Sequence, residues 1–261
     1  MEPQIDALKN LFGDLFAKLM AFTLEDEFQE ALGEALEVFY NMAEGEEYEF
    51  NPTEEFLFMA WFLLDDADAA GNSLIDEFLS RYSDDLTLQE TQICKALKET
   101  HLTLLQVKEI QPGRSISLRD LFLGEEFEVF EAAGSAEGIH KDSILYTRVL
   151  RLGETRFLVG AGVFLDQVVM EPLTQFITDQ YREECEDGQK VSFKQFLKEN
   201  GELINWWIRA LEQGELLDAE EGEQPPDGDK DDKDDKGGKD DKDGGKPPSD
   251  DKTPPDKPSE A

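Results

Sequence analysis

The sequence predicts an α+β protein, because the spacing of its apolar residues changes twice along the chain. In residues 1–100 apolar side chains recur at helical spacing, in residues 101–165 they alternate as in strands, and in residues 166–218 the helical spacing returns. Residues 219–261 consist mainly of Asp, Lys, Gly and Pro, which cannot form a core. We therefore expect an N-terminal helical region, a small antiparallel β-barrel-like unit, C-terminal helices and a disordered acidic tail.

The helical region is predicted to pack around residues 56–64, which are apolar at every position. Two further helices are expected to begin at capping boxes, where Ser73 precedes Asp76 and Thr87 precedes Glu90 by three residues. The helices expected before residue 56 cover residues 4–22 and 23–42.

The middle segment predicts five short strands, which favour a small barrel or a strongly bent sheet. They are expected at residues 102–110, 115–122, 126–131, 143–152 and 155–162. The last two should form a hairpin that turns at Gly153 and Glu154. Ser192 and Gln195 have the spacing of a cap for a C-terminal helix, which Gly201 is expected to divide.

The charge of the chain favours basic partners. The formal net charge is −36, and residues 1–100 alone hold 24 acidic and 5 basic side chains. Such a surface repels nucleic acid and anionic membranes over most of its area. Our first hypothesis is therefore a cytosolic interaction protein whose acidic helical surface binds a basic protein.

The near-neutral β unit supports an alternative hypothesis, which is binding of RNA or a nucleotide. Residues 101–165 hold 9 acidic and 7 basic side chains. The candidate ligand-binding residues are the five arginines of this segment, Arg114, Arg119, Arg148, Arg151 and Arg156. Arg148 and Arg151 should point to opposite faces of a strand, so they do not predict one patch by themselves. A competing interpretation is that these arginines neutralise nearby glutamates, and a further alternative is a nucleic-acid mimic.

No catalytic or cofactor-binding motif is found, so an enzyme is unsupported and no cofactor or metal is expected. Asp65, Asp66 and Asp68 suggest a magnesium site, but an acidic helix end explains them as well. Cys94 and His101 suggest a nucleophile pair, but a buried structural thiol explains Cys94 as well.

The expected compartment is the cytoplasm. The two cysteines cannot form a disulfide framework, the N-terminus lacks the basic region of a signal peptide, and the longest apolar run is too short to span a membrane. The sequence predicts no particular oligomeric state.

Five stretches carry a resemblance to a known family. They are Trp-Phe-Leu-Leu-Asp at 61–65, Ser-Leu-Ile-Asp-Glu-Phe at 73–78, Leu-Thr-Leu-Leu-Gln-Val at 102–107, Leu-Arg-Asp-Leu-Phe-Leu-Gly-Glu at 118–125 and Asp-Ser-Ile-Leu-Tyr-Thr-Arg-Val at 142–149. Their order resembles a bacterial family of poorly characterised proteins often described through a SEC-C metal-binding motif. The chain lacks the clustered cysteines and histidine that such a motif needs, so the resemblance implies no zinc site here.

Overall fold

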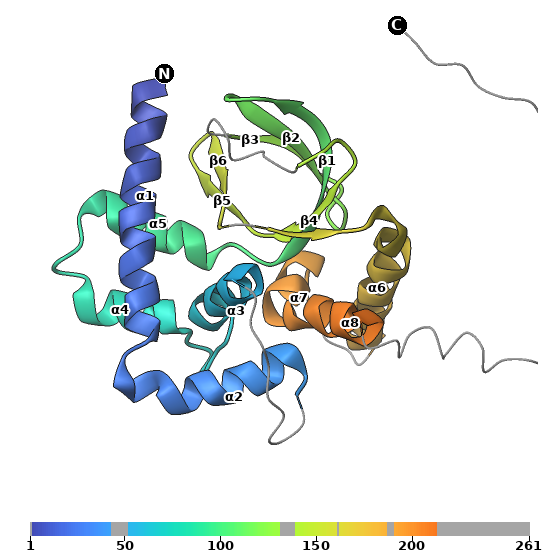
Figure 1. The fold of residues 1–261 in the computed structure, drawn as a ribbon. Helices are drawn as coiled ribbons and strands as arrows, with labels where there is room; N and C mark the ends of the chain where they lie inside the picture. Colours follow the sequence, from blue (N-terminus) through green and yellow to red (C-terminus); the bar gives the residue numbers. More distant parts are fainter. Residues whose placement is uncertain (1, 43–51, 131–138, 161, 187–190, 213–261) are drawn as a thin grey trace, which may run out of the picture. The chain divides into compact units, whose positions relative to one another are not determined.

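The computed structural model has an α+β architecture, which confirms the predicted fold class (Figure 1). It describes residues 2–42, 52–130, 139–160, 162–186 and 191–212. The predicted disordered tail, residues 219–261, lies outside the described residues.

The N-terminal half of the fold is helical. Its elements are α1 (Glu2–Thr23), the 3-10 helix η1 (Asp26–Phe28), α2 (Gln29–Tyr40), α3 (Pro52–Leu64), α4 (Leu74–Tyr82) and α5 (Leu88–Lys98). Helix α3 lies against α1, α2 and α4, and Trp61 to Leu64 are each at most 4 % exposed. Burial of a large apolar side chain contributes about 1.5–3 kcal/mol, so α3 supplies much of the core. Both predicted capping boxes form, at Ser73 and at Thr87.

The β unit contains a five-stranded antiparallel sheet and a separate hairpin. The strands are β1 (Thr103–Gln111), β2 (Ser115–Asp120), β3 (Glu126–Phe130), β4 (Ile144–Thr147), β5 (Val149–Leu152), β6 (Thr155–Leu158) and β7 (Val163–Leu165). The sheet order is β3-β2-β1-β4-β7, and β5 pairs with β6 in a separate two-stranded sheet. In Figure 1 β1 to β6 curve around a small core, whose buried members are Leu105, Val107, Ile116, Leu118, Val129, Ile139 and Leu145.

The predicted strand at residues 143–152 is in fact two strands. It breaks at Arg148, so that β4 belongs to the sheet and β5 to the hairpin. The Arg148 side chain pairs with Asp65 of the helical part instead of continuing the strand pattern. The predicted turn at Gly153 and Glu154 is confirmed, since Leu152 pairs with Thr155. Strand β7, which pairs with β4, was not predicted.

Helices return after the β unit, as predicted. They are the 3-10 helix η2 (Gln167–Val169), α6 (Met170–Glu186), α7 (Phe193–Glu199) and α8 (Glu202–Glu212). Gly201 separates α7 from α8, and a Cβ atom there would lie 3.2 Å from the Leu197 carbonyl oxygen. The larger core contains residues of α1, α3, β4 and α7, so the helical and β segments share it.

Candidate functional site

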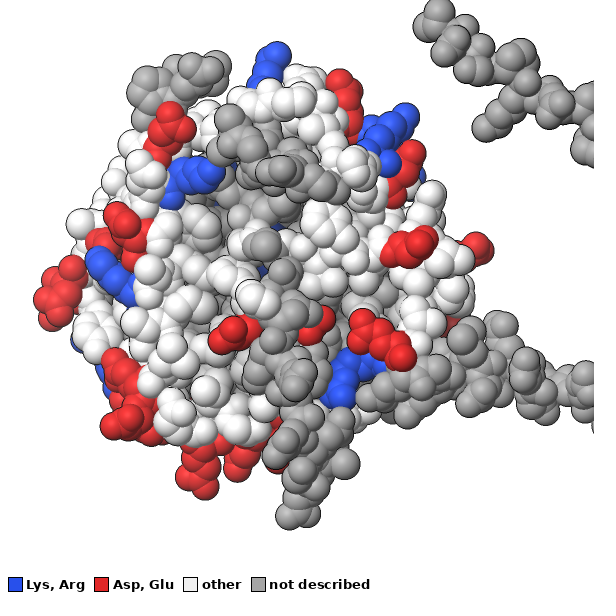
Figure 2. All heavy atoms as spheres, in the orientation of Figure 1, with Lys and Arg blue, Asp and Glu red and all other residues white. Residues whose placement is uncertain are grey.

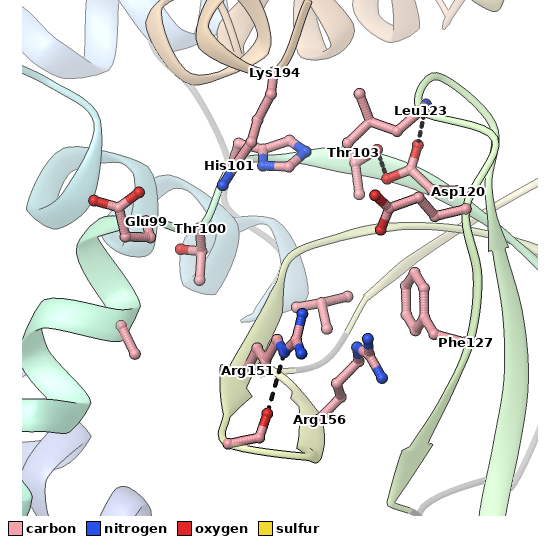
Figure 3. A pocket seen from close by; sticks show the side chains of 14 residues that line it. Glu99, Thr100, His101, Thr103, Asp120, Leu123, Phe127, Arg151, Arg156 and Lys194 are labelled. Carbon is pink, nitrogen blue, oxygen red and sulfur yellow. Dashed lines mark hydrogen bonds between the residues drawn. The ribbon is translucent and has the colours of Figure 1, made fainter.

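A cavity of 640 Å³ is lined by residues from the end of α5, the β unit and the start of α7 (Figure 3). Among the described residues, its charged lining consists of three cations and three carboxylates: Arg151, Arg156, Lys194, Glu99, Asp120 and Glu125. Cavities of about 300–1,000 Å³ are typical of small-molecule sites. We call it the arginine cavity.

Arg151 and Arg156 are direct cross-strand partners in the β5–β6 hairpin. Opposed residues project from one face of a hairpin, so both guanidinium groups extend into the cavity (Figure 3). Arg151 Nε donates to the Gly153 carbonyl oxygen at 3.1 Å, and the Arg156 guanidinium lies 5.3 Å from the centre of the Phe127 ring. Neither forms an ion pair with a described carboxylate. Like charges placed directly opposite each other destabilise a hairpin, so this pair weakens the fold unless an anion offsets it.

Lys194 reaches the cavity from another side, in the first turn of α7 (Figure 3). A cation in the first turn opposes the helix dipole, so this position is also unfavourable for stability. The lysine is exposed and has no ion pair with a described carboxylate.

His101 lines the cavity close to Lys194. Both ring nitrogens are buried and have no hydrogen-bond partner among the described residues. Burial, together with the nearby charges of Lys194 and Arg148, lowers the pKa of His101 to about 4. The imidazole is therefore neutral near pH 7.

Asp120 has a structural role in the cavity wall. Its carboxylate accepts hydrogen bonds from the backbone N–H groups of Phe122 at 2.9 Å and Leu123 at 2.8 Å, and from Thr103 Oγ1 at 3.0 Å. Burial raises the pKa of Asp120, although these hydrogen bonds oppose the shift. The other two carboxylates of the lining belong to exposed residues.

The other three predicted site residues lie elsewhere. Arg114 is exposed in the turn between β1 and β2, and Arg119 is exposed on β2 opposite Glu126 of β3. Neither lines the arginine cavity. Arg148 is fully buried and pairs with Asp65. The structure therefore brings only Arg151 and Arg156 of the five together in a cavity.

Arg148 belongs to a buried ion cluster, formed with Asp65 and Lys198. The Asp65 carboxylate pairs with both cations, and the side chains of Arg148 and Asp65 are 0 % and 1 % exposed. Lys198 Nζ also donates to the Leu64 carbonyl oxygen at 2.7 Å, and burial lowers the pKa of Lys198. Arg148 Nε and Nη1 are buried with no partner among the described residues. The cluster links the end of α3 to the β4–β5 junction and to α7.

Glu202 lies near this cluster, at the start of α8. Its Oε2 atom is buried without a described partner. Burial, with a contribution from the negative charges of Asp65 and Asp66, raises the pKa of Glu202 to about 7. This carboxyl group is therefore partly protonated near neutral pH.

Two of the three aspartates suggested as a magnesium site make local contacts of different kinds. Asp65 belongs to the ion cluster, and Asp68 accepts hydrogen bonds from the backbone N–H groups of Ala70 at 2.8 Å and Asn72 at 2.9 Å. Within the described ranges, no group of three His, Cys, Asp or Glu side chains could hold a metal ion.

Cys94 does not form a nucleophile pair with His101, because the His101 nitrogens have no described partner. The thiol is completely buried. Burial and the nearby Glu90 charge raise the pKa of Cys94 to about 11, so the thiol stays protonated at neutral pH.

A second cavity, of 400 Å³, lies in the acidic helical surface. We call it the acidic groove. Carboxylates of Glu34, Asp66, Asp68 and Glu77 line it, together with the apolar side chains of Ala31, Ala35, Val38, Phe62 and Leu74. Figure 2 shows acidic side chains gathered along the lower edge of the molecule, where α2 lies in Figure 1. This arrangement combines negative charge with an apolar lining.

Three residues of the arginine cavity were not predicted as site residues. Lys194 belongs to the C-terminal helices, for which no site residue was predicted, and the sequence suggested His101 only as a partner of Cys94. Phe127 was read only as part of a strand. The Ser192 cap already places Lys194 in the first turn of a helix, where a cation is unfavourable, and this signal was available in the sequence.

The fold and the cavity together define an α+β protein with a cavity beside its β unit that is lined by both cations and carboxylates. The chain belongs to a family of unknown function, DUF7986, whose sequence model matches residues 7–200. No curated protein and no solved structure matches the chain. Within the described residues, no helix is both long enough and apolar enough to span a membrane.

Proposed function

We propose that this protein binds a small phosphorylated ligand of the nucleotide class in the arginine cavity. The observation that carries the proposal is the direct pairing of Arg151 with Arg156 at a cavity wall, without a described carboxylate partner. Guanidinium groups form paired hydrogen bonds with phosphate oxygens, so an anion between them would offset their repulsion.

A small ligand fits this site better than an RNA strand. An RNA-binding surface needs a continuous basic track that follows the phosphates. Here Arg114 and Arg119 lie outside the cavity, and Glu99 and Glu125 line it. These carboxylates would repel a long polyanion, whereas a single phosphorylated molecule can be held between the arginines.

The test is a calorimetric titration of the full chain with adenosine monophosphate at low salt. The variant Arg151→Gln/Arg156→Gln should weaken binding by about tenfold or more, because each charged hydrogen bond contributes about 1.5–3 kcal/mol. The matched control is Arg114→Gln/Arg119→Gln, which removes the same charge outside the cavity and should bind as the wild type does. Equal losses in both variants, or no binding by the wild type at millimolar nucleotide, would contradict the proposal.

A second candidate function is binding of a basic protein in the acidic groove. Four acidic residues line a cavity whose wall also includes apolar residues, an arrangement suited to a basic segment with an apolar residue. Burial, together with the nearby Glu34 and Asp65 charges, raises the pKa of Asp66, and a bound cation would relieve this repulsion. A nucleic-acid mimic is one form of this candidate, with a DNA-binding protein as the partner.

The acidic groove is tested with a lysine-rich peptide that contains one leucine. Glu34→Gln/Asp66→Asn should weaken binding, and binding to the wild type should fade between low and moderate salt. Glu171→Gln/Glu199→Gln removes two exposed charges outside the groove and serves as the control. Binding that does not respond to salt or to the groove variant would exclude this candidate.

We further propose a cytoplasmic location and a distant relation to the SEC-C-associated proteins. Both described cysteines are free thiols, which a reducing compartment favours. The relation is supported by the sequence stretches at 118–125 and 142–149. Fractionation of the native cell checks the location, and a protein recovered outside the cytoplasm would overturn it.

A further inference from the structure

We infer that the ligand of the arginine cavity carries two separate anionic groups, one held by Arg151 and Arg156 and the other by Lys194. This inference rests on the function proposed above and specifies the chemistry of its ligand. It predicts a bisphosphorylated molecule in place of a monophosphate.

The cations of the cavity lie on two different walls. Arg151 and Arg156 extend from the β5–β6 hairpin, whereas Lys194 reaches in from α7 (Figure 3). A single phosphate between the two arginines would leave the lysine of the other wall without an anion. A ligand with a charge at each end engages both walls at once.

Each of these cations occupies a position that is unfavourable for the fold, and the reasons are independent. Arg151 and Arg156 repel each other across the hairpin, and Lys194 opposes the dipole of α7 in its first turn. None of the three has an ion pair with a described carboxylate. Proteins tend to break local rules of stability at their functional sites.

Besides the carboxylates of Glu99, Asp120 and Glu125, the remaining lining includes an uncharged part that suits a neutral connection between the two charges. His101 is uncharged near pH 7, and Phe127, Leu123 and Val149 supply apolar surface. The volume of 640 Å³ exceeds what an inorganic anion needs and accommodates a sugar or a nucleoside between two phosphates. The shared chemistry is therefore two phosphates joined by a neutral sugar-containing spacer, with or without a base.

The experiment compares matched mono- and bisphosphates on the full chain by calorimetry. One pair is adenosine monophosphate and adenosine 3′,5′-bisphosphate, and the other is fructose 6-phosphate and fructose 1,6-bisphosphate. The variant is Lys194→Gln, and the control is Lys141→Gln, an exposed lysine that does not line the cavity. Thermal unfolding of both variants checks that they fold as the wild type does.

The wild type should bind at least one bisphosphate about tenfold or more tightly than its monophosphate, as expected for an added charged hydrogen bond. Lys194→Gln should abolish this preference for the bisphosphate, because it weakens bisphosphate binding more than monophosphate binding, while Lys141→Gln should keep the preference. Preference in the adenosine pair alone identifies a nucleotide, and preference in both pairs identifies the bisphosphate itself.

Two results would overturn the inference while the proposed function stands. One is equal affinity of the wild type for both members of each pair, with binding still lost in Arg151→Gln/Arg156→Gln. The other is a ratio that survives in Lys194→Gln. If Arg151→Gln/Arg156→Gln binds these compounds as tightly as the wild type does, or if the wild type binds none of the four, the proposed function is overturned and this inference with it.

Discussion

Two arginines only three residues apart, Arg148 and Arg151, have opposite environments. Arg148 is completely buried and pairs with Asp65, 83 residues earlier in the chain. Arg151 is exposed, faces the like charge of Arg156 and lines a cavity. The difference shows that a charged residue type does not reveal its role, because packing decides whether the charge holds the fold together or remains available to a ligand.

The two environments have different energetic consequences. A buried ion pair loses hydration on both partners, and its attraction offsets that cost only while both are present. Removal of one partner leaves an isolated charge in the interior. An exposed charge remains hydrated, so its removal costs the fold little. The comparison therefore predicts large stability effects in the ion cluster and small effects in the arginine cavity.

The largest effect is expected for Asp65→Asn. This change leaves Arg148 and Lys198 as buried cations without their shared carboxylate, and breaking a buried pair costs about 3–5 kcal/mol. Urea denaturation followed by circular dichroism measures the loss. The control is Asp84→Asn, which changes an exposed carboxylate of the same type and should stay within about 0.5 kcal/mol of the wild type. A similar stability for both variants would show that Asp65 is not essential to the cluster.

An intermediate effect, which depends on pH, is expected for Glu202→Gln. The pKa of Glu202 is raised to about 7 in the folded protein, so folding favours its protonated form. Below the ordinary pKa of 4.5 the carboxyl is protonated in both states and its contribution to stability is complete. That contribution is lost as pH rises from about 4.5 to 7, because the unfolded chain ionises first.

Glutamine imitates the protonated carboxyl at every pH. Glu202→Gln should therefore match the wild type near pH 4.5 and exceed it near pH 8, by on the order of 1–3 kcal/mol. Urea denaturation across this range measures the difference, and Glu199→Gln, an exposed neighbour, should show none. An advantage for Glu202→Gln that does not grow with pH would mean that Glu202 is ionised throughout.

The sequence was sufficient to predict the helices and the hairpin that carry Asp65, Arg148 and Arg151 or lie beside them. The continuous apolar run at residues 56–64 predicted the buried α3, the capping boxes predicted the starts of α4 and α5, and Gly153 with Glu154 predicted the hairpin. A two-residue turn also fixes the register, so the pairing of Arg151 with Arg156 could have been predicted from the same observation.

The contacts of Arg148 and Lys194 with residues far away in the sequence could not be predicted. Residues 143–152 are rich in apolar and β-branched residues on both sides of Thr147 and Arg148, and one polar pair within such a stretch does not by itself show that the strand breaks there. Asp65, which pairs with Arg148 and Lys198, directly follows α3 and is far from both in the sequence, and one sequence does not show which distant residues meet. The approach of Lys194 to the cavity depends on the same packing.

The smallest effect on stability is expected for Arg151→Gln, which tests the exposed arginine of the comparison. The change removes one of two opposed like charges and an exposed hydrogen bond to the Gly153 carbonyl oxygen. Relief of repulsion and loss of that bond oppose each other, so stability should change by less than about 0.5 kcal/mol, with any gain confined to low salt. Urea denaturation at low and high salt measures this change in the free energy of unfolding.

Arg148→Gln is the matched comparison, because the same substitution three residues away should lower the free energy of unfolding several-fold more. A large loss of stability in Arg151→Gln would show that this arginine stabilises the hairpin and is not available to a ligand.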